Sequence, residues 1–288
     1  MIFEILFLSL KKSLFFCLSP LFVFIILSDP HFETFNGEAF SYHGECDLVM
    51  MESPSFASGL GLYVHIRTTR IDNARISYSY ISAAAVRIGT DVLEAKDDGS
   101  IIINGLPLAE DGTTFAGFPV IKTIKGSQKK IFVYDLILGE DDKTIQIRAN
   151  LKTGMLFVDM IGNFNKDSVG LMGRAGLTRG FLLARDGVTN LAGEWNTFGE
   201  EWQVHTNEPK LFAENRAPQH PAGCLYESQH QTKAHLRRRL MDDSMNAVMT
   251  IELATKACEN LVGRKKDFCI SDVMATGDLE LAEDPFYG

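Results

Sequence analysis

The chain has 288 residues, of which 45% are hydrophobic and 10% aromatic, so it can bury a full hydrophobic core. Its formal net charge is −9 and its pI is near 5.3. This balance argues against nucleic acid or an anionic membrane surface as a partner, because no basic stripe dominates the sequence. The one basic run, Arg237–Arg239 with Lys233 nearby, is local and is interpreted as a solvated or protease-accessible linker.

Residues 1–28 form a unit of their own. Lys11 and Lys12 precede the uncharged stretch Ser13–Ser28, which is mostly Leu, Phe, Ile and Val. This pattern is typical of the hydrophobic region of a signal peptide, and the stretch is short for a membrane span of about 20 residues. We therefore predict a secretory signal, with an uncleaved membrane anchor or a start inside a longer protein as alternatives. All three place the rest of the chain outside the cytosol.

Residues 29–47 carry the signals of a first β-hairpin. Asp29-Pro30 is a turn-initiating pair, and Asn36-Gly37 is a strong hairpin signal, because both central residues of a type I′ turn need positive φ. Gly44 lets the chain turn again before Cys46. Aromatic residues at mostly strand-like spacing flank the turn: Phe32, Phe35, Phe40 and Tyr42. A β-sheet domain is expected to begin here.

The middle of the chain is predicted to be all β. Side chains alternate in Leu60–Thr69, with Leu62, Val64 and Ile66 on one face of the expected strand. Turns rich in Gly, Asn and Asp, such as Asn104-Gly105, separate further strand-like segments at 77–88, 92–95, 100–103, 120–124, 130–138, 144–149 and 156–160. Short strands at near-regular spacing predict a mainly β fold, an antiparallel β-sandwich or open barrel, with a small α-helical hairpin at the C-terminus.

Several blocks resemble a known family. Asp29-Pro30-His31-Phe32, Thr34-Phe35-Asn36-Gly37 and Gly44-Glu45-Cys46-Asp47 together resemble the opening of the von Willebrand factor type D (VWD) domain, which typically reads DPHF, TFDG, an aromatic pair and G-x-C-x-Y. Later blocks resemble the family's V-x-I-G and V-N-G strands, its C-G-L-C-G turn and its closing F-G-x-S-W-x-V strand: Ala85–Gly89, Ile103–Gly105, Val169–Gly173 and Phe198–Val204. The resemblance covers residues 29–204 and implies a VWD-like β domain at 29–206.

The chain departs from the family pattern around the turn Val169–Gly173. Met172 stands where the family has a cysteine, and Arg174-Ala175-Gly176 stands where it has N-F-N. Both the family's disulfide and its calcium loop are therefore in question here. Further along, Arg185-Asp186-Gly187 is interpreted as a plain turn with a local ion pair.

Calcium is the one cofactor that the resemblance raises. The family's site gathers oxygen ligands just after the C-G-L-C-G turn, and calcium takes about six to eight oxygens. The candidates here are Asp167 before the turn and Asp186 and Asn190 after it. No acidic residue occurs between Arg174 and Arg185, and the segment's arginines add positive charge where the ion would lie. We expect a loop held by ordinary hydrogen bonds and no cofactor, with calcium as the minor alternative.

Cysteine usage agrees with an exported protein. Once residues 1–28 are set aside, four of the five cysteines remain, and an even number in an exported chain permits two disulfides. Cys258 and Cys269 lie on either side of Gly263 in a stretch that is predicted as helix, turn, helix, so they are expected to pair. Cys46 and Cys224 would then join the start of the β domain to the segment after it. Four buried free thiols are the alternative.

The composition changes after Val204. Residues 207–241 are predicted to be a linker, of which the proline-containing part 207–223 is extended and packed on the domain. Residues 242–288 are predicted to be a helical, disulfide-clamped tail, with helices at 242–261 and 265–276. The tail is interpreted as a hairpin that packs on itself or on the β domain, with a partner-docking element as the alternative.

Catalytic motifs are weak. His31 is expected to be packed or hydrogen-bonded, and His65 lies alone on a strand face. The sequence has no G-x-S-x-G, no glycine-rich phosphate loop and no zinc-type histidine pair, so no enzyme is predicted. The resemblance implies a secreted or cell-surface structural or adhesive module that assembles with extracellular proteins or glycans or with itself. A carbohydrate- or lipid-binding module is the first alternative and a hydrolase the second.

Overall fold

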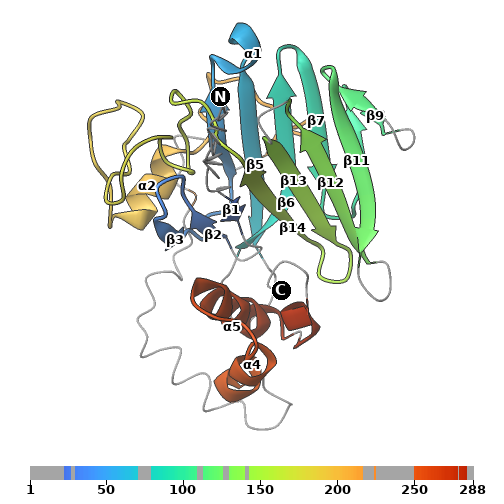
Figure 1. Cartoon of the computed structure of the whole chain (residues 1–288), viewed down its shortest axis with the longest axis vertical. Helices are drawn as coiled ribbons and strands as arrows, with labels where there is room; N and C mark the ends of the chain where they lie inside the picture. Colours follow the sequence, from blue (N-terminus) through green and yellow to red (C-terminus); the bar gives the residue numbers. More distant parts are fainter. Residues whose placement is uncertain are drawn as a thin grey trace, which may run out of the picture.

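The computed structural model describes residues 23–26, 30–70, 79–108, 113–125, 130–139, 143–216, 224, 250–277 and 279–283. These residues form two antiparallel β-sheets that face each other, with a short helix (Trp195–Glu201) at their side and a helical unit at one end (Figure 1). The predicted fold class is therefore confirmed as a mainly β, two-sheet structure, and the sheets do not close into a barrel.

Within the described residues one sheet has eight strands and the other has six. The first has the order β10 (Thr114–Phe115), β11 (Phe118–Lys125), β12 (Ile131–Ile137), β13 (Thr144–Asn150), β14 (Met155–Ile161), β1 (Val23–Ile26), β2 (His31–Glu33) and β3 (Ala39–Ser41). The second has the order β4 (Asp47–Ser53), β5 (Leu62–Arg70), β6 (Ser79–Ile88), β7 (Asp91–Lys96), β8 (Ile101–Ile103) and β9 (Leu106–Pro107).

The core lies between the sheets and follows the expected alternation. Leu62, Val64 and Ile66 of β5 are fully buried and belong to the same apolar cluster as Leu156 and Val158 of β14. Because successive side chains of a strand point to opposite faces, each sheet contributes one apolar face to this core. The outer faces of the two sheets are covered in part by the segments that follow β14.

The two Asn-Gly pairs form different turns. Asn104 and Gly105 have φ of 51° and 80° and join Ile103 directly to Leu106, as a type I′ hairpin requires. At the first hairpin only Gly37 has positive φ, and Glu33 pairs with Ala39 across a longer loop. The type I′ turn expected at Asn36-Gly37 is therefore wrong. The Asn36 side chain is instead used at long range, where it donates to the carbonyls of Thr178 and Phe181 at 3.0 and 2.8 Å.

Strand β1 falls inside the segment that we interpreted as a leader. It pairs with β14 along its whole length and with β2 at Ile26 and Phe32, so it lies inside the eight-stranded sheet. The β domain therefore begins before residue 29 in this structure. Residues 1–22 and 27–29 lie outside the described residues. No helix within the described ranges is long and apolar enough to cross a membrane.

The segment that resembles the family's closing strand is mostly helical, so that expectation is wrong. Helix α2 runs over Trp195–Glu201, and only Gln203 forms a bridge, to Leu48 of β4. Phe198 and Trp202 are both buried. Their spacing of four puts them on one face of a helical turn, which allows both rings to reach the core. The remaining described helix of the β domain is the short α1 (Phe56–Gly59).

The tail forms a small unit of α4 (Ile251–Ala257), α5 (Arg264–Thr276) and the 3-10 helix η2 (Leu279–Glu283). Helix α4 is shorter than predicted: Thr250 caps it by accepting from the Leu253 amide, and it ends before Cys258, while residues 242–249 lie outside the described part. The unit packs on Met155 and Phe157 of β14. Phe268 stacks on His31, with ring centroids 4.7 Å apart.

Candidate functional site

The candidate site is built around β4, whose outer edge is covered by two segments from far along the chain. The first is the turn at residues 169–173. Val169 and Glu52 exchange two backbone hydrogen bonds of 2.8 and 2.9 Å, and the Leu171 amide donates to the Val49 carbonyl at 3.1 Å. The Met172 carbonyl accepts from the Phe35 amide at 2.8 Å, which ties the first hairpin to the same turn. The family-like turn therefore joins both sheets.

Glycine is required at Gly170 for two reasons. Its φ is +140°, and a Cβ there would lie 2.4 Å from the Met50 carbonyl oxygen. Met172, which stands in place of the family's cysteine, is fully buried in the main core. At this position apolar packing replaces a covalent link.

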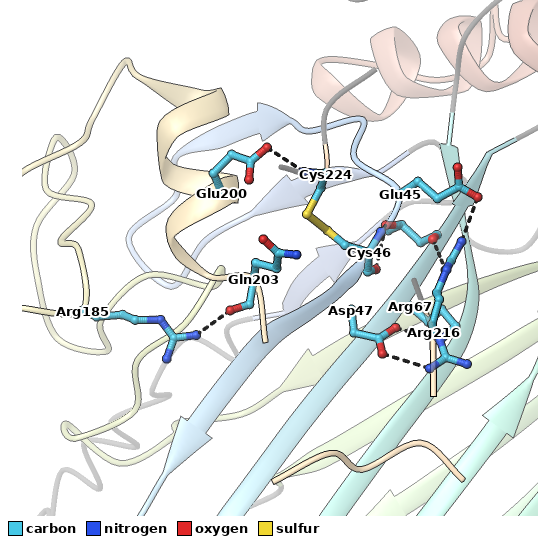
Figure 2. The surroundings of a disulfide bond; sticks show 10 residues. Glu45, Cys46, Asp47, Arg67, Arg185, Glu200, Gln203, Arg216 and Cys224 are labelled. Atoms are coloured by element: carbon cyan, nitrogen blue, oxygen red, sulfur yellow. Dashed lines mark hydrogen bonds and ion pairs between the residues drawn. A yellow bond between two sulfur atoms is a disulfide. The ribbon is translucent and has the colours of Figure 1, made fainter. Parts of the chain in front are cut away.

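The second covering segment follows helix α2. The Val49 amide donates to the Trp202 carbonyl at 2.7 Å, and the Val204 amide donates to the Asp47 carbonyl at 2.9 Å. The disulfide between Cys46 and Cys224 closes this edge, with a Cα–Cα distance of 5.5 Å (Figure 2). The Cys224 amide also donates to Glu200 Oε1 at 3.0 Å. This pairing and the Cys258–Cys269 bond are those that the sequence favoured.

Residues 205–216, called here the cover segment, lie over the outer face of the six-stranded sheet. Leu211 and Phe212 are buried against Ala83 and Ala85 of β6. The part of the predicted linker that the structure describes, 207–216, is thus packed on the domain. It is not a free connection.

Two arginines fasten the cover segment to the sheet (Figure 2). Arg67 binds both carboxylate oxygens of Asp47, at 2.7 and 2.9 Å, and donates to the Glu214 carbonyl at 2.7 Å. Arg216 reaches back to Glu45 Oε1 at 2.9 Å and also donates to the Thr68 carbonyl. Such charge-assisted, paired contacts are stronger than neutral hydrogen bonds. They fix the cover segment at its C-terminal end.

Arg185 fastens the other end. Its guanidinium donates to the carbonyls of Glu201 and Gln203 at 2.8 and 3.0 Å and binds the carboxylate of Glu208. It also lies 4.9 Å from the Trp202 ring centre. The local ion pair expected in Arg185-Asp186-Gly187 is therefore wrong, because the carboxylate that Arg185 binds belongs to Glu208. One side chain joins the 174–194 loop, helix α2 and the cover segment.

The three calcium candidates use their oxygens in other ways. Asp186 accepts from the amides of Val188 and Thr189, each at 2.8 Å, and from the Thr189 hydroxyl at 2.6 Å. The hydroxyl of Thr189, followed by these amides, lowers the pKa of Asp186. Asn190 Oδ1 accepts from the Leu182 amide at 2.9 Å. Both residues therefore shape a turn within their own loop.

Asp167 binds a different part of the chain. Its carboxylate accepts from the Ser55 amide at 2.8 Å and from the Ser53 hydroxyl at 3.3 Å, next to α1. Burial raises its pKa, but these hydrogen bonds outweigh burial and hold the pKa below its usual value. The three candidates do not fit a shared calcium site, since Asp167 binds the segment next to α1 whereas Asp186 and Asn190 bind amides of their own loop. Within the described ranges no group of three or more His, Cys, Asp or Glu side chains could hold a metal ion.

Two titratable groups whose pKa values are shifted by burial lie on β5 and β4. His65 is 3% exposed on β5, and its pKa falls from 6.5 to about 3 because of burial and the nearby Arg87 and Arg185. Burial raises the pKa of Glu52 on β4, and the same two arginines partly offset this rise. His31, in contrast, binds the Ser41 hydroxyl at 2.5 Å and stacks on Phe268, so it is packed and hydrogen-bonded, as expected.

These features define a β-sandwich module whose edge and outer face are closed by a long-range disulfide and by arginine contacts. The sequence model of the von Willebrand factor type D domain matches residues 25–175. Because the match spans more than half of the chain, the protein belongs to the von Willebrand factor type D domain family. A search of the curated proteins finds no match. Domains of this family are non-enzymatic and typically extracellular.

Sequence reasoning missed most of the residues that hold this site together. The sequence pattern suggested for Arg185 only a positive charge near the calcium loop and a local ion pair in a turn, and Arg67, Glu208 and Arg216 were not singled out. The carboxylate and carbonyl partners of the three arginines lie 16 to 171 residues away along the chain. Residue spacing along the chain could not have predicted these contacts. The arginines after Gly173 did indicate that the loop needs positive charge.

Proposed function

We propose that this protein is a non-catalytic extracellular module that acts in structural or adhesive assembly with other macromolecules outside the cell. One observation carries the proposal: Arg67, Arg185 and Arg216 each bind a carboxylate and at least one backbone carbonyl of a distant segment. Their charges are used to hold a rigid surface in place. Such preorganisation favours binding of large partners, because little conformational entropy is lost on association.

The proposed partners are extracellular proteins or glycans, and self-assembly is included. Nucleic acid is not among them, since the net charge of −9 would repel a polyphosphate. Contact with a membrane would come only through an uncleaved N-terminal segment. Disulfides persist in oxidising compartments, so the two bonds support export of the protein.

The experiment that tests this proposal is mass spectrometry of the protein from the medium and surface of its native cells, with and without reduction. A parallel sample would be prepared from intact cells that have first been treated with a chemical cross-linker. The proposal expects extracellular protein with two disulfides, cross-linked to other extracellular proteins, to glycoproteins or to itself. Recovery inside the cell with free thiols would contradict it.

The same experiment separates the other function classes. Enrichment of free glycans or lipids on the purified protein would favour the carbohydrate- or lipid-binding alternative. The mass of the mature chain also tests strand β1, because a start after Ser28 would remove a strand that pairs with β14 and β2. Retention of residues 23–26 would show that this strand is part of the exported domain.

A further inference from the structure

We propose that Arg185 is the structural cation of the 174–194 loop, that it does the work of a bound metal ion, and that the domain therefore folds and remains stable without calcium. This inference concerns a property of the chain that is independent of the proposed assembly function.

The set of oxygens around Arg185 is of the kind that calcium takes in proteins. It consists of the backbone carbonyls of Glu201 and Gln203 and both carboxylate oxygens of Glu208. Backbone carbonyls and carboxylates are typical calcium ligands. Here they converge on a cation that the chain itself provides. The planar guanidinium can satisfy several acceptors at once, which a single lysine ammonium at the same place would do less well.

The contacts of Arg185 also have the mechanical effect expected of a bound ion. Its own amide donates to Glu201 Oε1 at 2.9 Å, so the backbone and the side chain of Arg185 both bind the end of α2. Glu208 in turn accepts from the His205 amide at 2.8 Å. The 174–194 loop, helix α2 and the cover segment are therefore all held by the Arg185 guanidinium. The Arg185 and Glu208 side chains are about one-fifth exposed, so water screens this pair only in part.

The loop sequence supports the same conclusion. Residues 174–185 hold three arginines and no acidic residue, and the turn-forming Asp186 and Asn190 already accept local hydrogen bonds. Arg179 is a useful comparison, because it is 67% exposed and meets one carboxylate, that of Glu38, at 3.4 Å. Arg185, in contrast, donates to two backbone carbonyls and binds a carboxylate as well.

The first test compares thermal unfolding of the full chain in about 5 mM CaCl2 and in an excess of EGTA, a calcium level that exceeds the Kd of about 0.1–1 mM usual for extracellular modules. The proposal expects melting temperatures that agree within about 1 °C. A calcium-dependent rise of about 3 °C or more, as linkage predicts for a real site, would overturn it.

The second test asks whether the oxygens can accept another cation. Arg185→Ser should lower the melting temperature by roughly 5 °C in EGTA, and calcium should restore at least half of that loss. The matched control Arg179→Ser should change by no more than about 1 °C and should not respond to calcium. If Arg185→Ser folds and is indifferent to calcium, the oxygens do not form a cation site and the proposal fails.

A variant that does not fold still decides the question. The soluble yield of Arg185→Ser after refolding would then be compared with and without calcium, with Arg185→Lys as the charge-conserving variant. Recovery of Arg185→Ser by calcium, together with a calcium-insensitive Arg185→Lys, supports the proposal. Equal yields of Arg185→Ser in both solutions overturn it.

Discussion

The ring of Tyr42 lies against the backbone of Gly199. A Cβ on Gly199 would lie 2.2 Å from Tyr42 Cδ2, and the ring itself is fully buried. Gly44 meets the same ring from another position, since a Cβ there would lie 2.7 Å from Tyr42 Cε1. Helix α2 can therefore approach the first hairpin only because its residue 199 has no side chain. This contact positions helix α2, and therefore also the segment after it, which begins the cover segment and lies along the edge of β4.

Gly199→Ala is expected to destabilise the protein by about 1–3 kcal/mol, because the added methyl group overpacks a closed contact with a buried ring. Gly199 has no positive φ, so the loss would come from packing and not from backbone strain. The control is Gly154→Ala, where a Cβ meets nothing within 4 Å and the φ of 64° costs about 1 kcal/mol. Urea unfolding of both variants measures the difference. Equal losses would show that the Tyr42 contact relaxes freely.

The sequence allowed the class of fold and most strands to be predicted, because alternation and turn residues act locally. Prediction from the sequence was less reliable wherever long-range contacts determine the local conformation. Asn104-Gly105 forms the expected type I′ turn, since only the adjacent strands act on it. Asn36-Gly37 does not, because the Asn36 side chain is held by carbonyls 142 and 145 residues away.

The same reasoning explains the helix at Trp195–Glu201, where a family-like strand was expected. The spacing of Phe198 and Trp202 fits either one face of a helix or one face of a strand, so periodicity alone could not decide. Of the candidate site, the disulfide partners could be inferred by elimination among four cysteines. The arginine contacts could not, because a charged residue on an acidic surface has many potential partners.

The two disulfides should differ in their contribution to stability. Cys46 and Cys224 are 178 residues apart and Cys258 and Cys269 are 11 apart, so the first bond restrains the unfolded chain far more. In the chain-entropy model the expected losses are up to about 5 kcal/mol for Cys46→Ser/Cys224→Ser and about 3 kcal/mol for Cys258→Ser/Cys269→Ser.

Hydrogen exchange followed by mass spectrometry checks this difference by region. Loss of the first bond should increase exchange in β4 and α2, whereas loss of the second should increase it mainly in α4 and α5. Faster exchange of the whole chain in the Cys258→Ser/Cys269→Ser variant would contradict this and would show that the tail and the β domain unfold together.

Buried His65 should make the fold sensitive to acid. Its pKa is about 3 in the folded protein and near 6.5 when unfolded, so the unfolded chain binds more protons between these values. Stability is therefore fully present above about pH 6.5 and falls by up to about 1.4 kcal/mol for each pH unit below it. The raised pKa of Glu52 acts in the opposite direction and offsets part of this loss.

The test is urea unfolding of the wild type and His65→Gln from about pH 7 to pH 4, a range that covers most of the titration of His65. The variant should show a clearly flatter decline, although burial of an amide lowers its stability at neutral pH. Parallel curves for the wild type and His65→Gln would mean that other groups cause the acid sensitivity.

The ion pair between Arg148 on β13 and Asp159 on β14 should show strong coupling. Their nitrogen and oxygen are 2.9 Å apart, and both side chains are only 6% exposed. Removal of either partner takes an opposite charge away from a buried ion, so Asp159→Asn and Arg148→Met are each expected to cost about 3–5 kcal/mol. The double variant should lose clearly less than the sum, since no buried charge remains. A double-mutant cycle by urea unfolding measures this coupling. The control is the pair of Arg179 and Glu38, in which the Arg179 side chain is 67% exposed, with an expected coupling below about 1 kcal/mol. Additive losses at Arg148 and Asp159 would show that each charge is stabilised mainly by its other neighbours on the sheet.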